Sequence, residues 1–219
     1  MGETITHKLK AFSLAQILEM ESRFRAQFIN SLGGFKSVCL VGTQNKSGLS
    51  NLAIFNSVMH IGSHPPLMGL LFRPDVVERH TLENILETHF YTINHLNETI
   101  YKQAHQTAAR YNRTISEFDA TGLTRFYKSD FFAPFVKEST IQIGLEFKEK
   151  TVIKSNQTIL LIGEVKQVTL PKKCIKEDGF LDLELAKTIT CSGLDSYHNT
   201  KIIDRLSYAK PDKLSTSIL

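Results

Sequence analysis

The tripeptide Arg79-His80-Thr81 places a guanidinium, an imidazole and a hydroxyl immediately before a segment with helical periodicity, residues 81–88. Thr81 is expected to be the N-cap of this helix, because its hydroxyl can accept a hydrogen bond from an otherwise unpaired N–H group. Helix N-termini attract anions, and an arginine beside one adds a full positive charge. The pattern predicts a phosphate site, and a capped surface helix with solvated flanks is the alternative.

A second candidate is the strand SNLAIFNSV, residues 50–58, in which small polar side chains interrupt an apolar run. Side chains alternate between the two faces of a strand, so Asn51, Ala53, Phe55 and Ser57 share one face. The small Ala53 would let a flat ring approach the backbone, with Asn51 and Ser57 as hydrogen-bonding groups beside it. The alternative is a strand whose polar groups face water or a turn.

Composition limits the classes of partner. The chain has 219 residues, 42% apolar and 22% charged, which suits one sizeable domain. Its net charge of +4 comes from scattered basic residues, so no nucleic-acid partner is expected. No apolar run approaches the roughly 20 residues of a membrane-spanning helix, and no secretory signal is visible. We therefore expect a cytoplasmic protein with no membrane partner.

Cysteine and histidine spacing does not indicate a metal site. The three cysteines include no C-x-x-C pair, which argues against a disulfide scaffold or a zinc ribbon. Cys39 reads as a buried strand residue, whereas Cys174 and Cys191 are expected to be semi-exposed. His60 and His64 are four residues apart, but Pro65 disfavours the helix that would bring them together. No metal ligand is predicted.

The elements that would position the candidate residues are mostly strands. Strands are expected at residues 37–43, 49–61, 67–72, 90–96, 141–147 and 158–168, and 181–185 has strand-like spacing. Helices are expected at 13–29, 81–88, 99–110 and 200–206, and residues 112–140 read as an irregular loop. Because strands and helices do not alternate regularly, a closed antiparallel barrel with peripheral helices fits better than a doubly wound sheet. The fold class is therefore mainly β.

Several segments together resemble one known family. They are GLSNLAIFNSV (48–58), HPPLMGLLFRP (64–74), RHTLENILET (79–88), FYTINHL (90–96), SEFDATGL (116–123), APFVKES (133–139), and GLDSYH with RLSYAKP near the C-terminus. In this order they are similar to the flavin reductase-like family of FMN-binding split barrels, above all its flavoredoxin branch. The resemblance covers roughly residues 30–211.

The resemblance implies an N-terminal helical arm (1–30), an FMN-binding split-barrel domain (31–211), a C-terminal tail (212–219), and FMN held non-covalently at a homodimer interface. Asn51 and the backbone of residues 53–56 would line the isoalloxazine. Ser57 and Arg73 would approach the ribityl-phosphate, and residues 79–81 would hold the phosphate. The full implied set of cofactor contacts is Asn51, Leu52, Ala53, Ile54, Phe55, Asn56, Ser57, Arg73, Arg79, His80, Thr81 and Asn84.

The resemblance also implies the chemistry. Flavin N5 accepts hydride, so no catalytic side chain is expected. The expected function is an oxidoreductase that moves hydride or electrons from NAD(P)H through FMN to a small-molecule or protein acceptor. The alternatives are an electron-transfer flavoprotein reduced by a partner protein, and a flavin-binding protein with little turnover. The residues after 196 would either close over the flavin or pack on the partner subunit.

Overall fold

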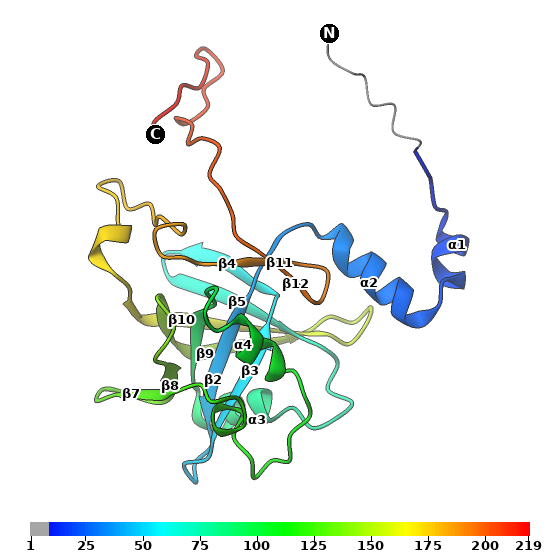
Figure 1. Ribbon diagram of the computed structural model, residues 1–219, viewed down its shortest axis with the longest axis vertical. Helices are drawn as coiled ribbons and strands as arrows, with labels where there is room; N and C mark the ends of the chain where they lie inside the picture. Colours follow the sequence, from blue (N-terminus) through cyan, green and yellow to red (C-terminus); the bar gives the residue numbers. More distant parts are fainter. Residues whose placement is uncertain (1–8) are drawn as a thin grey trace.

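The structure is a computed structural model that describes residues 9–219. Its centre is a seven-stranded antiparallel sheet with the strand order β3-β2-β6-β9-β10-β5-β4 (Figure 1). The strands are β2 (Cys39–Gln44), β3 (Ser50–Phe55), β4 (Val58–Ser63), β5 (Pro66–Phe72), β6 (Phe90–His95), β9 (Gln142–Val152) and β10 (Ile159–Thr169).

The two edge strands of this sheet are consecutive in the chain, so the sheet must curl into a barrel. Only Asn56 and Ser57 separate β3 from β4. Near this point Ser37 Oγ donates to Val58 O at 2.7 Å, and Leu71 N donates to Ser57 O at 3.1 Å. The mainly β split barrel is confirmed. The prediction of one strand over 49–61 is wrong, because the chain crosses between sheet edges in its middle.

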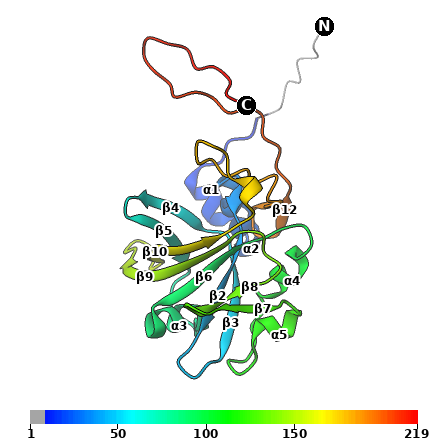
Figure 2. The ribbon, with the colours of Figure 1, turned by 90° about the vertical axis from the view of Figure 1, so that its left-hand side faces the viewer.

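The barrel interior holds the main apolar core. Alternate residues of the strands point inward, among them Cys39, Leu70 and Tyr91, and each is almost fully buried. The helix α3 (His80–Thr88) closes one end of the barrel by burying Leu82 and Ile85 in the same core. At the opposite end, where β2 begins and β6 ends, the segment after β10 packs on the barrel and buries Cys174 and Ala186 in the same core (Figure 2).

A second core lies outside the barrel wall, between β3 and two short helices. The helices α4 (Tyr101–Gln106) and α5 (Glu117–Thr121) pack there, with Leu52 and Phe118 buried between the elements. The hairpin of β7 (Arg125–Lys128) and β8 (Phe131–Val136) follows. The prediction of an irregular loop over 112–140 is therefore wrong, and the helix predicted over 99–110 is shorter than expected.

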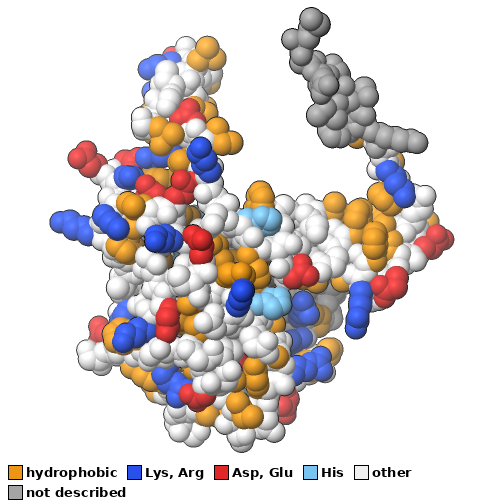
Figure 3. All heavy atoms as spheres, in the orientation of Figure 1, with side chains coloured by type: hydrophobic (Ala, Val, Ile, Leu, Met, Phe, Trp, Pro, Cys, Tyr) orange, Lys and Arg blue, Asp and Glu red, His pale blue; other side chains and the backbone are white. Residues whose placement is uncertain are grey.

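The N-terminal arm lies beside the barrel and not on it. It consists of α1 (Leu14–Glu19) and α2 (Ser22–Leu32), so the single helix predicted over 13–29 is interrupted at residues 20–21. Ser13 caps α1 as expected, and its hydroxyl accepts from Gln16 N at 3.3 Å. Neither helix contains a buried residue, and apolar side chains are visible on the arm surface in Figure 3. Residues 1–8 of the arm proposed from the sequence lie outside the described residues.

The C-terminal part adds small elements and a projecting tail. The short helix η1 (Lys172–Cys174) is followed by β11 (Thr190–Ser192) and β12 (Ser196–His198), which form a sheet with β1 (Lys36–Ser37). Neither the helix predicted over 200–206 nor a strand over 181–185 is present. Within residues 9–219, no helix is both long and apolar enough to cross a membrane.

All three cysteines are buried and free. Cys39 confirms the sequence prediction, and burial raises the pKa of its thiol. The expected partial exposure of the other two is wrong, since Cys174 is 0% and Cys191 is 3% exposed. Both lie in short C-terminal segments that pack back on the barrel, and local sequence does not reveal such packing.

Candidate functional site

The polar residues of β3 and α3 meet at the end of the barrel that α3 closes. Asn51 Nδ2 donates to Thr81 Oγ1 at 2.9 Å, and both side chains are buried. Thr81 is the second residue of α3, and the N-cap position belongs to Arg79, which makes no side-chain cap. The prediction of Thr81 as N-cap is therefore wrong, because its hydroxyl is engaged with the strand.

A second pair joins α3 to the neighbouring strand β2, one helical turn further along the helix. Asn84 Nδ2 donates to Thr43 Oγ1 at 3.1 Å, which ties α3 to β2. Asn84 and Thr43 are 3% and 0% exposed, so each needs this partner to offset its burial. Asn84 therefore lies in the predicted cluster, while the sequence gave no indication of Thr43.

Arg79 is placed to bind an anion at the start of α3. Its Nη2 donates to Pro74 O at 3.2 Å, but its Nε is buried and has no partner among the described residues. The first N–H groups of any helix also lack intrahelical acceptors. The Arg79 backbone N–H donates to Glu83 Oε1 at 3.2 Å. The N–H groups that follow it in the first turn remain available to an anion.

Two acidic residues moderate the charge around this helix start. His80 Nε2 lies 3.6 Å from a carboxylate oxygen of Glu78. Arg113 forms an ion pair with Glu83, and this hydrogen bond is the main reason that the pKa of Glu83 is lowered. With Glu83 committed to Arg113, the Arg79 guanidinium is not neutralised by it.

Glu117, on α5, is a member of this region that sequence reasoning did not identify. It is 7% exposed and accepts the Leu52 backbone N–H at 2.9 Å. Burial raises its pKa, and the hydrogen bond from Leu52 partly opposes that rise. Its neighbour Ser116 shares a 3.0 Å hydrogen bond with Ser50. The sequence pattern that could have predicted α5 is Ser116 followed by acidic residues, which is typical of a helix start.

The remaining predicted residues of β3 follow the expected alternation. Leu52 and Ile54 face the outer core, and Phe55 packs edge-on against Phe72 with ring centroids 4.9 Å apart. Ala53 is only partly buried. Leu52 contributes neither its side chain nor its N–H to a surface that a ligand could reach.

Asn56 and Ser57 occupy the crossing between the two sheet edges. Both are partly buried, and Ser57 Oγ donates to Asn56 Oδ1 at 3.2 Å. Asn56 Nδ2 donates to Gly193 O over a long distance of 3.5 Å. The structure therefore places these two polar side chains at the far end of β3 from Asn51.

Arg73 is not part of the buried cluster. It is exposed directly after β5, and no hydrogen bond or ion pair links its side chain to another residue in the range 9–219. Its proposed contact with a ribityl-phosphate stays a prediction.

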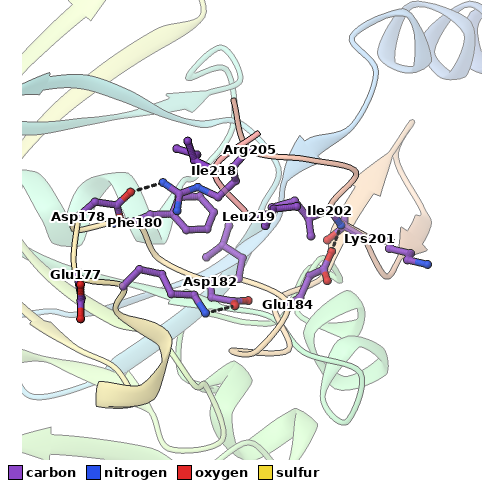
Figure 4. A pocket seen from close by; sticks show the side chains of 13 residues that line it. Glu177, Asp178, Phe180, Asp182, Glu184, Lys201, Ile202, Arg205, Ile218 and Leu219 are labelled. Carbon is purple, nitrogen blue, oxygen red and sulfur yellow. Dashed lines mark hydrogen bonds and ion pairs between the residues drawn. The ribbon is translucent and has the colours of Figure 1, made fainter. Parts of the chain in front are cut away.

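A large pocket lies elsewhere in the molecule (Figure 4). Its volume is 660 Å³, and residues 176–184 and the C-terminal tail line it. There Arg205 pairs with Asp178 and lies over the ring of Phe180, at 4.0 Å from the centroid. None of the residues predicted to bind the cofactor lines this pocket. Across residues 9–219, no three His, Cys, Asp or Glu side chains are grouped as metal ligands.

Comparisons with known proteins identify the family. Residues 35–183 match the family described as flavin reductase like domain. A candidate flavin reductase with a split barrel domain from Shewanella frigidimarina NCIMB 400 is 50% identical, with a TM-score of 0.88 over 91% of this chain and 100% of the other.

Two more distant structures share the fold. Nitrilotriacetate monooxygenase component B from Bacillus cereus is 20% identical, with a TM-score of 0.78 over 90% of this chain and 98% of its own. Flavoredoxin of Desulfovibrio vulgaris (Miyazaki F) is also 20% identical, with a TM-score of 0.66 over 82% and 92%. The likeness to flavoredoxin is thus one of fold. The chain belongs to the flavin reductase-like family and has its split-barrel architecture.

Proposed function

We propose that the protein binds FMN non-covalently and moves hydride or electrons from NAD(P)H through it to a small-molecule or protein acceptor. The observation that carries the proposal is the buried, unpartnered Nε of Arg79 beside the first turn of α3. A phosphate there would accept from the guanidinium and from the helix N–H groups together. The 50% identity to a candidate flavin reductase supports an oxidoreductase of the same kind.

The residues around Arg79 have distinct roles in this proposal. Arg79 and His80 supply donors to the phosphate, and Thr81 and Asn84 fix α3 against β3 and β2 through their side-chain hydrogen bonds. Arg73 approaches the same phosphate from the end of β5. The helix position is thereby set before the ligand arrives, which reduces the entropy lost on binding.

The edge of β3 is suited to the flat ring. Leu52 N–H points away from β2 toward Glu117, and N–H directions alternate along a strand, so Ile54 N–H also faces away from β2. The small side chain of Ala53 lets the ring approach the backbone of β3. Asn56 and Ser57 add polar groups at the end of this strand. A bound flavin supplies hydride acceptance at N5, and the protein orients the ring and supplies donors to it.

A homodimer would complete this site. The edge of β3 and the crossing at Asn56 are open in the single chain, so a partner subunit would have to cover the remaining part of the ring. The N-terminal arm supports such an assembly, because Leu14, Phe24 and Leu32 are 70%, 59% and 67% exposed. Large apolar side chains that are exposed together on one segment are typical of an interface. We place the assembly in the cytoplasm.

The test is the absorption spectrum of the purified protein, followed by stopped-flow mixing of the FMN-loaded protein with NADH or NADPH. Rapid bleaching of bound FMN by either nucleotide supports the proposal. Bleaching by dithionite or a reduced partner protein alone would replace it with the electron-transfer flavoprotein. Bleaching without transfer to any acceptor would indicate a flavin-binding protein with little turnover. A colourless protein that takes up no FMN from solution contradicts all three.

A further inference from the structure

A second cavity lies at the end of the barrel opposite α3. Its volume is 440 Å³, within the range of small-molecule sites. Met68 of β5, Cys39 of β2 and Ile93 of β6 form its floor, and residues 188–190 and Phe35 form its rim. On β2, Cys39 lines this cavity whereas Thr43 contacts α3, so the length of the strand separates the cavity from the phosphate end of the proposed flavin site.

Three of the polar side chains in the cavity walls are already paired within the protein. Ser37 Oγ donates to Val58 O at 2.7 Å, and Thr190 Oγ1 donates to Lys36 O at 2.6 Å. Lys36 Nζ, the one permanent charge among the lining residues that the structure describes, donates to Gly193 O at 2.7 Å. A charged ligand would therefore find no free counter-charge of either sign at the walls.

Three further polar residues line the cavity: His60 and Thr200, which are exposed and make no side-chain hydrogen bond within residues 9–219, and His95, which is half-buried. His95 follows Tyr91 and Ile93 on the inward face of β6, so its imidazole points into the barrel end where the cavity lies. Its Nδ1 is 3.2 Å from Thr188 Oγ1, and its Nε2 has no hydrogen-bond partner within residues 9–219. Burial lowers the pKa of His95 to about 4, so the ring is neutral at pH 7 and can offer one nitrogen to a ligand.

We infer that this cavity binds a small, uncharged aromatic molecule whose single hydroxyl or carbonyl group hydrogen-bonds to His95 Nε2. The apolar walls favour a ring, and the thioethers of Met59 and Met68 make favourable contacts with aromatic rings. None of the lining residues is among those proposed to contact FMN, although Val58 directly follows Ser57, so the cavity adjoins the ring end of the proposed flavin site.

The methionines provide the test. The chain has four, of which Met59 and Met68 line the cavity, Met20 lies on the arm, and Met1 is outside the described residues. Protein labelled with ¹³C at the methionine methyl groups is titrated with phenol and with toluene. Substitutions Met59→Leu and Met68→Leu assign the signals. We expect the Met59 and Met68 signals to shift saturably while that of Met20 stays in place.

The hydrogen bond is tested with His95→Phe, which keeps an aromatic ring but removes the nitrogen. This change should weaken phenol binding about five- to tenfold and leave toluene within twofold, since a single neutral hydrogen bond is removed. The control is His105→Phe on the exposed face of α4, which should alter neither ligand. Two outcomes would overturn the inference: no saturable shift of the cavity methionines with either probe, or equal loss of phenol and toluene binding in His95→Phe.

Discussion

Asn51 Nδ2 donates to Thr81 Oγ1 at 2.9 Å, and this bond joins the edge strand of the barrel to the first turn of α3. Asn51 is 7% exposed and Thr81 is 7% exposed, so water cannot readily replace the bond. The two halves of the proposed flavin site, β3 for the ring and α3 for the phosphate, are thereby held in one geometry.

Substitution Thr81→Val should therefore lower stability. It preserves the shape of the side chain but leaves the buried amide of Asn51 without its acceptor. The free energy of unfolding should fall by about 1–3 kcal/mol. Urea unfolding followed by far-UV circular dichroism measures the change. Thr88→Val is the matched control, because the Thr88 hydroxyl bonds only to Asn84 O of its own helix. An equal effect of the two substitutions would mean that the strand–helix hydrogen bond contributes no more to the free energy of unfolding than the bond within the helix.

Substitution Arg79→Ala should weaken FMN binding by about 1.5–3 kcal/mol, because a charge-assisted bond to phosphate is removed. This range corresponds to a roughly 10- to 150-fold larger dissociation constant, measurable by fluorescence quenching of FMN. Riboflavin, which has no phosphate, should bind equally to both proteins. Arg73→Ala tests whether the exposed arginine contributes. An unchanged FMN affinity in Arg79→Ala excludes the phosphate role.

The sequence predicted most of the barrel but less of the site. Alternation correctly placed alternate residues from Asn51 to Phe55 on one face of β3, and the strand predicted over residues 90–96 matches β6. The split between β3 and β4 at Asn56–Ser57 was missed, since the crossing between sheet edges is a property of the closed barrel. The role of Glu117 was missed for a similar reason: its partner, Leu52 N–H, is 65 residues away in the chain. Side-chain type indicates chemistry, but only tertiary structure selects the partner.

Glu117→Gln should change how stability depends on pH. Burial raises the pKa of Glu117 above its unfolded value, so between those two pKa values the folded state holds a proton that the unfolded state has released. Stability therefore falls as pH rises through this window. Glutamine still accepts the Leu52 N–H but does not titrate, so the variant should gain stability relative to the wild type as the pH rises above 4.5. Urea unfolding at a series of pH values measures the difference. A parallel pair of stability curves would show that the carboxyl titrates normally.

Charges on the apolar stripe of α2 should disrupt the proposed dimer. Phe24 and Leu32 are two helical turns apart on one face and are 59% and 67% exposed. The double substitution Phe24→Glu/Leu32→Glu should reduce the mass found by light scattering from about two chains, 2 × 24.8 kDa = 49.6 kDa, to one. Ala26→Glu, on the opposite face, should leave the mass unchanged. A wild-type mass of one chain would refute the dimer directly.

His95 should make the protein less stable in mild acid. Burial lowers the pKa of His95 from 6.5 to about 4. Above about pH 6.5 the imidazole is neutral in both the folded and the unfolded state, so it does not change the free energy of unfolding with pH. Between 6.5 and 4 the unfolded chain binds a proton that the folded chain does not, so the free energy of unfolding falls by up to about 1.4 kcal/mol per pH unit.

His95→Gln should remove this contribution and flatten the stability curve between pH 7.5 and 4.5. His105→Gln is the control, because His105 hydrogen-bonds to Tyr197 at the surface of the molecule. Other groups titrate in the same range, so the measured quantity is the difference between wild type and each variant in urea unfolding at several pH values. A constant difference for His95→Gln would mean that the imidazole is protonated equally in both states. In that case the neutral hydrogen-bonding group inferred for the barrel cavity would lose its support.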